Sequence, residues 1–225
     1  MKIIHLDTNH SSLLHQLSAA GFENHQDYTS SKAEIEKKIH NYDGIIIRSR
    51  FSIDQSFLDK AINLKFIGRV GAGLENIDCN YAISKGIELI SAPEGNRNAV
   101  SEHALGMLLS LFNNLNKADK EVRKGLWLRE ENRGEEVDGK TIGLIGYGNM
   151  GKAFAKKLRG FDVDVIFYDI KEGLENENAK QVTLEYLQQH ANVLSLHTPL
   201  TELTTKMINE AFINKFSKPY AYRYS

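Results

Sequence analysis

Short apolar runs alternate with amphipathic segments along the N-terminal part of the chain. The apolar runs predict β-strands at residues 2–6, 44–48, 64–70 and 87–91. The segments between them have helical spacing or capping residues and predict helices at 9–20, 31–40, 54–61 and 77–85. Because strands that alternate with helices form a parallel sheet covered by those helices, we expect residues 1–97 to form one open α/β domain.

A longer helical pattern follows this domain. Its apolar side chains recur near every 3.6 residues on one face; they are Val100, Ala104, Met107, Leu108, Leu111, Leu115, Ala118 and Val122. A continuous helix over residues 99–123 would be about 37 Å long, at roughly 1.5 Å per residue. That length is sufficient to bridge two domains. We therefore expect an interdomain helix at 99–123, near the beginning of a second domain of residues 98–225.

The second domain contains the most informative pattern in the chain. An apolar run at 141–145 enters the turn Gly146-Tyr-Gly-Asn-Met-Gly151, a helix-like segment follows at 152–159, and a second apolar run at 163–168 leads into Asp169. In such a turn the first glycine allows a tight bend, the second lets the backbone approach a pyrophosphate, and the third lets helix and strand pack closely. The N–H groups at the start of the helix favour phosphate.

A G-x-G-x-x-G turn alone is weak evidence, because glycine turns are common. Here the order of strand, turn, helix, strand and acid indicates a dinucleotide site in preference to an ordinary turn. Asp169 can accept hydrogen bonds from an adenosine ribose and would repel a 2′-phosphate. The pattern therefore predicts NAD as the cofactor, rather than NADP. Lys171 weakens this preference slightly, unless it is a solvated charge.

Further strands and helices are predicted beyond Asp169. A short strand is expected at 180–182, a helix capped by Thr183 follows, and a buried strand lies at 192–196. This strand ends at His197-Thr-Pro199, where the proline cannot donate to a sheet ladder. The fold class predicted for the chain is α/β, with two open, doubly wound parallel sheets.

The composition is that of a globular protein and argues against several classes of function. Of the 225 residues, 41% are hydrophobic and 25% are charged, and the formal net charge is −1. This balance gives no electrostatic argument for binding nucleic acid or an anionic membrane. No apolar run approaches the roughly 18 residues that span a bilayer, and the N-terminal segment does not resemble a signal peptide. The single cysteine, Cys79, suits a reducing cytoplasm, and no metal site is predicted.

Six motifs follow one another along the chain in a characteristic order. They are Ile47-Arg-Ser-Arg50, Gly68-Arg-Val-Gly-Ala-Gly-Leu-Glu-Asn-Ile-Asp78, Ala92-Pro-Glu-Gly-Asn96, Ala99-Val-Ser-Glu-His-Ala-Leu-Gly106, Gly139-Lys-Thr-Ile-Gly-Leu-Ile-Gly-Tyr-Gly-Asn-Met-Gly151 and His197-Thr-Pro-Leu-Thr201. In this series the chain resembles the D-isomer-specific 2-hydroxyacid dehydrogenases, and most closely their phosphoglycerate dehydrogenase branch. The resemblance extends over nearly all of residues 1–215. It implies a flavodoxin-like substrate domain, a Rossmann NAD domain that is incomplete here, and NAD-dependent chemistry at the CH–OH group of a D-2-hydroxy acid.

The resemblance also implies roles for individual residues. The substrate-binding positions would be Arg48, Ser49, Gly71, Ala72, Gly73 and Asn96, and the glycine-rich backbone would offer N–H groups to the carboxylate of a small acidic substrate. The NAD-binding positions would be Val100, Gly146, Gly148, Asn149, Met150, Gly151, Asp169, His197, Thr198 and Pro199. Two alternatives stay open: Arg48 could be a solvated charge at a strand end, and Gly71 and Gly73 could be turn glycines only.

The chain departs from the family pattern near its C-terminus. The family's catalytic arginine lies in a motif similar to Asn-Thr-Ala-Arg-Gly, where this chain has Tyr220-Ala-Tyr-Arg-Tyr-Ser225. No histidine follows His197, so we assign no catalytic residue. We expect a truncated or frameshifted family member that binds NAD but turns substrate over slowly or not at all. A non-catalytic NAD-binding module and an unstable fragment are the alternatives.

Two expectations concern the surface of the second domain. The resemblance implies a homodimer, formed through the 99–123 helix and the segment near Trp127, although Trp127 could instead fold back on its own domain. The strand at 192–196 would have an open edge unless the tyrosine-rich tail pairs with it. Tyrosines at 220, 222 and 224 alternate with other residues, which is compatible with one short strand.

Overall fold

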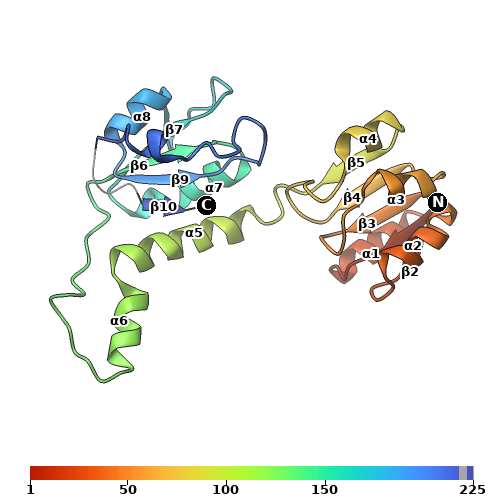
Figure 1. Cartoon of the computed structure of the whole chain (residues 1–225), viewed down its shortest axis with the longest axis horizontal. Helices are drawn as coiled ribbons and strands as arrows, with labels where there is room; N and C mark the ends of the chain where they lie inside the picture. The colour runs from red at the N-terminus through yellow and green to blue at the C-terminus, as the bar shows by residue number, and fades with distance from the viewer. Residues whose placement is uncertain (218–221, 225) are drawn as a thin grey trace. The chain divides into compact units, whose positions relative to one another are not determined.

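A computed structural model describes residues 1–217 and 222–224, the last three as backbone only. The chain divides into two compact units, residues 1–96 and 97–225 (Figure 1). This boundary lies one residue before the expected one. Each unit contains one five-stranded sheet whose neighbouring strands run parallel, so the predicted α/β class is confirmed. Among the described residues, no helix is both long enough and apolar enough to cross a membrane.

The sheet of the first unit has the strand order β2-β1-β3-β4-β5. Its strands are β1 (Lys2–His5), β2 (Glu23–Gln26), β3 (Gly44–Ile47), β4 (Phe66–Arg69) and β5 (Glu88–Ser91). The helices between them are α1 (Ser11–Ala19), α2 (Lys32–Lys38), α3 (Gln55–Lys60) and α4 (Cys79–Ser84), with the short 3₁₀ helix η1 (Ile39–Asn41) after α2. This is the 2-1-3-4-5 order of flavodoxin-like sheets.

Strand β2 is the one element of this sheet that the apolar pattern did not predict. Its residues, Glu-Asn-His-Gln, are all polar and are exposed or half-buried. β2 lies at the edge of the sheet and pairs only with β1, from Lys2 opposite Glu23 to His5 opposite Gln26. Because backbone hydrogen bonds hold an edge strand, such a strand can form without an apolar face.

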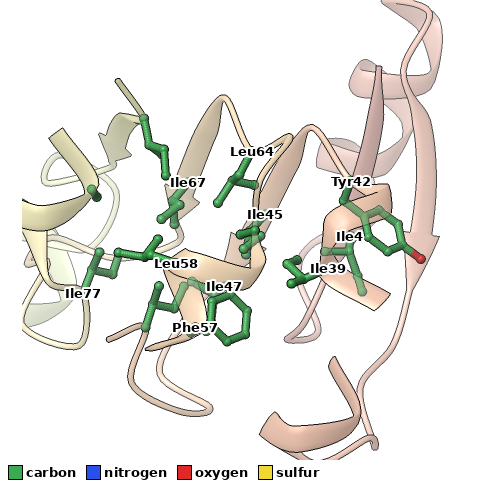
Figure 2. Packing of buried hydrophobic residues seen from close by; sticks show 14 of the residues in the cluster. Ile4, Ile39, Tyr42, Ile45, Ile47, Phe57, Leu58, Leu64, Ile67 and Ile77 are labelled. Atoms are coloured by element: carbon green, nitrogen blue, oxygen red, sulfur yellow. The ribbon is translucent and has the colours of Figure 1, made fainter. Parts of the chain in front are cut away.

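The core of the first unit forms where equivalent positions of neighbouring strands meet. Ile4 lies opposite Ile45, and Ile45 lies opposite Ile67, in three adjacent parallel strands. All three side chains are fully buried, and Phe57 from α3 joins the same cluster (Figure 2). Ile46, whose side chain points to the other face of β3, is also buried. Both faces of the sheet are therefore covered, as the run of three isoleucines predicted.

The sheet of the second unit has the order β10-β9-β6-β7-β8. Its strands are β6 (Thr141–Ile145), β7 (Asp164–Tyr168), β8 (Lys180–Gln181), β9 (Val193–Leu196) and β10 (Tyr222–Tyr224). The helices that follow the strands are α7 (Asn149–Lys157), with the 3₁₀ turn η2 (Leu158–Gly160), α8 (Leu184–His190) and α9 (Glu210–Ile213). Numbered within this unit, the strand order is 5-4-1-2-3, the arrangement of Rossmann sheets read from the opposite edge.

The tail of the chain supplies the edge strand of this sheet. The backbone of β10 pairs in parallel with β9, with Tyr222 opposite Val193 and Tyr224 opposite Ser195. Of the two possibilities left open for the edge of β9, pairing with the tail is therefore the one observed. Tyr220, which was also assigned to this strand, lies outside the described residues.

The expected single helix at 99–123 is wrong. Two helices occupy this region, α5 (Arg97–Phe112) and α6 (Leu115–Val122). Asn114 between them has a left-handed backbone with φ 52°, which interrupts the helical hydrogen bonds; asparagine tolerates this conformation better than most residues. The side chains of Asn113 and Asn114 also bond to backbone oxygens, of Leu109 and Arg133 respectively. As a result α6 turns away from the line of α5 and projects from the sheet of its unit (Figure 1).

Candidate functional site

The glycine turn lies between β6 and α7, at the carboxyl edge of the second sheet. Gly146 has φ +90°, a backbone conformation that side chains rarely allow. A Cβ atom at Gly146 would lie 2.5 Å from the backbone oxygen of His197, and one at Gly151 would overlap the carbonyl oxygen of Gly146. These two glycines are therefore required by the fold of the turn itself, as predicted for a tight bend and a close helix contact.

Gly148 differs from the other two glycines of the turn. No atom lies within 4 Å of the place where a Cβ atom would stand, and its φ of −78° is accessible to any residue. The fold of the turn therefore does not require a glycine at position 148, and the missing side chain leaves open space beside the turn.

The first turn of α7 faces the same region. Gly148 is the N-cap and provides no side-chain cap. Among the described residues, the N–H groups of Asn149, Met150 and Gly151 have no acceptor, while the N–H of Lys152 begins the helical bonding to the Gly148 oxygen. Free N–H groups at the positive end of a helix dipole attract phosphate. The start of α7 therefore offers three backbone N–H groups that can donate to an anion.

Asp169 stands directly after β7, next to the glycine turn, and is half-buried. Its Oδ2 atom accepts a hydrogen bond of 2.7 Å from the backbone N–H of Tyr147, and its Oδ1 atom accepts one of 2.9 Å from the N–H of Lys171. These two bonds fix the carboxylate beside the turn. Because each carboxylate oxygen has more than one lone pair, both can still accept bonds from the hydroxyls of a ribose.

Tyr147, the residue between the first two glycines, anchors the turn to the core. Its ring is fully buried and stacks on Phe167 with 3.8 Å between ring centroids. Its hydroxyl donates a 2.8 Å hydrogen bond to Oδ1 of Asn176, and burial raises the pKa of the Tyr147 phenol. Sequence reasoning missed this residue, because the G-x-G pattern accepts any side chain at that position.

The His197–Pro199 segment lies against the glycine turn. The backbone N–H of His197 donates to the Ile145 oxygen at 2.7 Å, and the Thr198 methyl carbon lies 2.9 Å from the place a Cβ of Gly146 would take. The His197 ring lies 3.0 Å from the Ser195 hydroxyl, measured at Nε2, and 5.4 Å from the Phe154 ring centroid. Burial lowers the pKa of His197 to about 4, so its imidazole is neutral at pH 7 and a weak proton acceptor.

The other residues predicted to contact the cofactor lie close to the glycine turn in sequence or on elements that pack beside it. Asn149 and Met150 are the first two residues of α7 and are half-buried. Val100 lies in the first turn of α5, a helix that packs against α7, and is 36% exposed. Pro199 is exposed.

In the first unit, the structure brings Arg48 and Ser49 to the carboxyl end of β3. Their backbone N–H groups donate to Oδ2 of Asp7, at 2.6 Å and 3.2 Å, and the Arg48 guanidinium donates to the Thr8 oxygen at 3.1 Å. Both residues are exposed. Asp7, which sequence reasoning missed, thus fixes the backbone of both from the end of the neighbouring strand β1.

The glycine stretch after β4 only partly matches its expected role as a set of N–H donors. The N–H of Gly71 already donates to the Arg69 oxygen at 2.9 Å, whereas those of Ala72 and Gly73 have no acceptor within the described part of the chain. The guanidinium of Arg69 packs against Gly71 and donates from Nε to the Arg48 oxygen at 3.1 Å. Asn96 is exposed and is the last residue of the first unit.

Comparison with known proteins identifies the family. The model of the family described as D-isomer specific 2-hydroxyacid dehydrogenase, NAD binding domain, matches residues 105–221, just over half of the chain. The chain belongs to this family. The D-3-phosphoglycerate dehydrogenase of Archaeoglobus fulgidus is 35% identical over 188 residues, which are 82% of this chain and 36% of that protein. The hydroxypyruvate reductase of Thermotoga maritima is 35% identical over 184 residues, 82% of this chain and 60% of that one.

A solved structure shows the same arrangement of strands and helices. The PH0520 protein from Pyrococcus horikoshii OT3 has a TM-score of 0.83 and 28% identity, and the match covers 99% of this chain and 69% of that one. The chain spans about a third to three fifths of the length of the two curated relatives.

The cofactor of this family domain is NAD, and the second unit has the features that NAD requires. The start of α7 offers unpaired N–H groups, position 148 leaves open space beside the turn, and the carboxylate of Asp169 is hydrogen-bonded to the turn. The predicted family and the predicted cofactor are confirmed. The contacts assigned to individual residues remain predictions.

Proposed function

We propose that the second unit holds the diphosphate of NAD against the start of α7 and the adenosine ribose at Asp169. The observation that supports this most strongly is the combination of free N–H groups with open space beside Gly148. Gly146 and Gly151 shape the turn, while His197, Thr198 and Pro199 line one side of the cofactor site. Val100 packs near the nicotinamide.

The whole protein, in this proposal, acts on the CH–OH group of a small acidic D-2-hydroxy acid, a class that includes 3-phosphoglycerate. NAD supplies the carbon that accepts or donates the hydride. In the first unit, Arg48 and Asn96 orient the acid, and the free N–H groups of Ala72 and Gly73 donate to its carboxylate. Arg69, beside Gly71, adds a positive charge to the same edge of the sheet.

The 225-residue chain by itself is proposed to bind NAD with little or no turnover. Oxidation of a hydroxyl requires a group that takes its proton, and such a group works best with a pKa near the operating pH. His197 has a pKa of about 4, and no histidine follows it in the sequence. This observation also favours the second candidate function, a non-catalytic NAD-binding module.

A second copy of the chain is the proposed partner. Four apolar side chains on α6 and the segment after it are exposed; they are Leu115 (54%), Val122 (53%), Leu126 (47%) and Trp127 (81%). Exposed apolar groups of this kind, with an aromatic residue among them, are typical of protein interfaces. They support a homodimer formed through α6.

The direct test is a titration of the 225-residue chain with NADH, followed by cofactor fluorescence, with the Gly148→Val variant as the matched control. We expect saturable binding by the wild-type chain and none by the variant. An assay of NAD reduction with D-2-hydroxy acids then separates the two candidate functions. Brisk turnover would overturn the inactivity proposal, and failure of the wild-type chain to bind NADH would overturn both.

A further inference from the structure

A polar pocket lies beside α7 in the second unit. It has a volume of about 540 Å³ and is open to the surface between the start of α5 and one side of α7. Its lining residues are Arg97, Asn98, Asn149, Lys152, Ala153, Lys156, Lys157 and Asn178. Basic and amide side chains supply all of this lining except Ala153, and no acidic residue takes part. Its volume lies within the range of sites for small molecules.

Most of the positive charge in this pocket is not neutralised by the protein. Only Lys157 has a carboxylate partner, Glu102, at 2.8 Å. Within the described part of the chain, no ion pair is formed by Arg97, Lys152 or Lys156. Lys152 instead has its ammonium group 5.9 Å from the ring centroid of Tyr147. Three cations from two elements therefore face one pocket without a counter-charge.

The positions of these lysines on α7 are unfavourable for the helix alone. Lys152 and Lys156 are four residues apart and therefore share one side of the helix, where like charges repel. Lys152 also lies in the first turns of α7, near the positive end of the helix dipole, where a cation is disfavoured. The dipole favours Lys156 in the last turn, so Lys152 is the residue whose placement the helix does not explain.

We propose that this basic pocket binds the phosphate group of a small phosphorylated metabolite. A guanidinium group and two ammonium groups neutralise a phosphate dianion, and the amides of Asn98, Asn149 and Asn178 can donate to its oxygens. The pocket extends along the side of α7 as far as Lys157, well beyond the start of the helix that is proposed to receive the NAD diphosphate. Asn149 lies at the border between the two.

The experiment uses the 225-residue chain labelled with ¹⁵N and titrated with inorganic phosphate at constant ionic strength. Backbone amide shifts report binding, and glycerol phosphate serves as a second probe with a phosphate ester. We expect shifts at residues 97–98 and 152–157, and affinity about tenfold lower in Lys156→Gln and in Arg97→Gln. Lys215→Gln, which removes an exposed lysine beyond α9, is the matched control and should leave phosphate affinity unchanged.

A repeat titration with NADH present separates this pocket from the cofactor site. We expect phosphate to bind with the same affinity when NADH is bound, and Lys156→Gln to leave NADH affinity within about twofold.

Three outcomes decide the inference. Phosphate binding that disappears with NADH present would place the anion in the cofactor site and overturn the inference. Equal affinity in the wild-type chain and Lys156→Gln, or an equal loss in Lys215→Gln, would overturn it as well. Stronger binding of the ester than of free phosphate would identify a metabolite as the ligand rather than the free ion. Because NADH binding is measured separately, failure here is distinct from failure of the proposed function.

Discussion

The carboxylate of Asp169 accepts a hydrogen bond of 2.7 Å from the backbone N–H of Tyr147. This bond joins the end of β7 to the middle of the glycine turn after β6. The acid that is proposed to recognise a ribose and the turn that is proposed to recognise phosphates are thus held together by the protein itself. The site is arranged before any ligand arrives, which reduces the ordering that binding requires.

Replacement of Asp169 by alanine tests both roles of this carboxylate. We expect NADH affinity to fall by about 1.5–3 kcal/mol, roughly ten- to a hundredfold, through loss of charge-assisted hydrogen bonds. The free energy of unfolding of the second unit should also fall by about 1–3 kcal/mol, because the Tyr147 N–H loses its acceptor. Fluorescence titration and urea denaturation measure the two effects. Asp169→Asn keeps one acceptor and should lie between wild type and alanine; an alanine variant with unchanged NADH affinity would mean that the ribose is held elsewhere.

Substitutions at two glycines of the turn should have different effects: one should abolish NADH binding and the other should lower the stability of the fold. Gly148→Val adds a side chain into open space, so the melting temperature should stay close to wild type while NADH binding is lost. Gly146→Ala forces a residue to φ +90° and brings Cβ to 2.5 Å from the His197 oxygen, so stability should fall by about 1–3 kcal/mol. Thermal denaturation alongside NADH titration provides the comparison. Equal melting temperatures in the two variants would contradict the assigned roles.

The lowered pKa of the half-buried His197 imidazole predicts that the second unit loses stability at acid pH. In the unfolded chain His197 takes up a proton near its ordinary pKa of 6.5, whereas in the folded protein it does so only near a pKa of about 4. The unfolded state therefore binds more protons between these values, and stability should be lost as the pH falls from 6.5 toward 4. Hydrogen exchange of amides in β6 and β9 measures this unit alone. His197→Gln should flatten the profile, while His103→Gln, on the exposed side of α5, should not; a profile unchanged by His197→Gln would rule out this origin.

The exposed apolar side chains near α6 predict that Trp127 contributes to the proposed homodimer. Trp127→Ser should raise the dissociation constant of the dimer about 30-fold or more, because buried aromatic residues carry much of an interface's binding energy. Light scattering coupled to size-exclusion chromatography measures the change. Leu200→Ser, which removes a side chain of similar exposure (76%) outside this region, is the matched control. A wild-type chain that is monomeric at high concentration would contradict the proposed homodimer.

The sequence predicted those parts of the structure that depend on local chemistry. The apolar runs located β1, β3, β4, β6, β7 and β9, and Thr183 caps α8 as expected. β2 could not be predicted because its polar residues are held only by backbone pairing with β1. The break at Asn114 was missed because apolar spacing continues across it, while the left-handed backbone there leaves no periodic signal.

The candidate site likewise has features that the sequence predicts and features that only the structure shows. The glycine turn and Asp169 follow from residue types at fixed spacing, and the structure brings them into direct contact. The fully buried stacking of Tyr147, the contact of Asp7 with the 48–49 backbone and the pocket near Arg97 depend on which strands and helices become neighbours. Contacts of this kind join residues that are far apart in the sequence, so no local sequence pattern indicates them.

A crystal structure of the chain with NADH tests the central claim most directly. We expect the diphosphate within hydrogen-bond distance of the N–H groups of Asn149 and Met150, and the adenosine ribose hydroxyls at the carboxylate of Asp169. A nucleotide bound away from the start of α7, or side chains filling the space beside Gly148, would contradict the assignment.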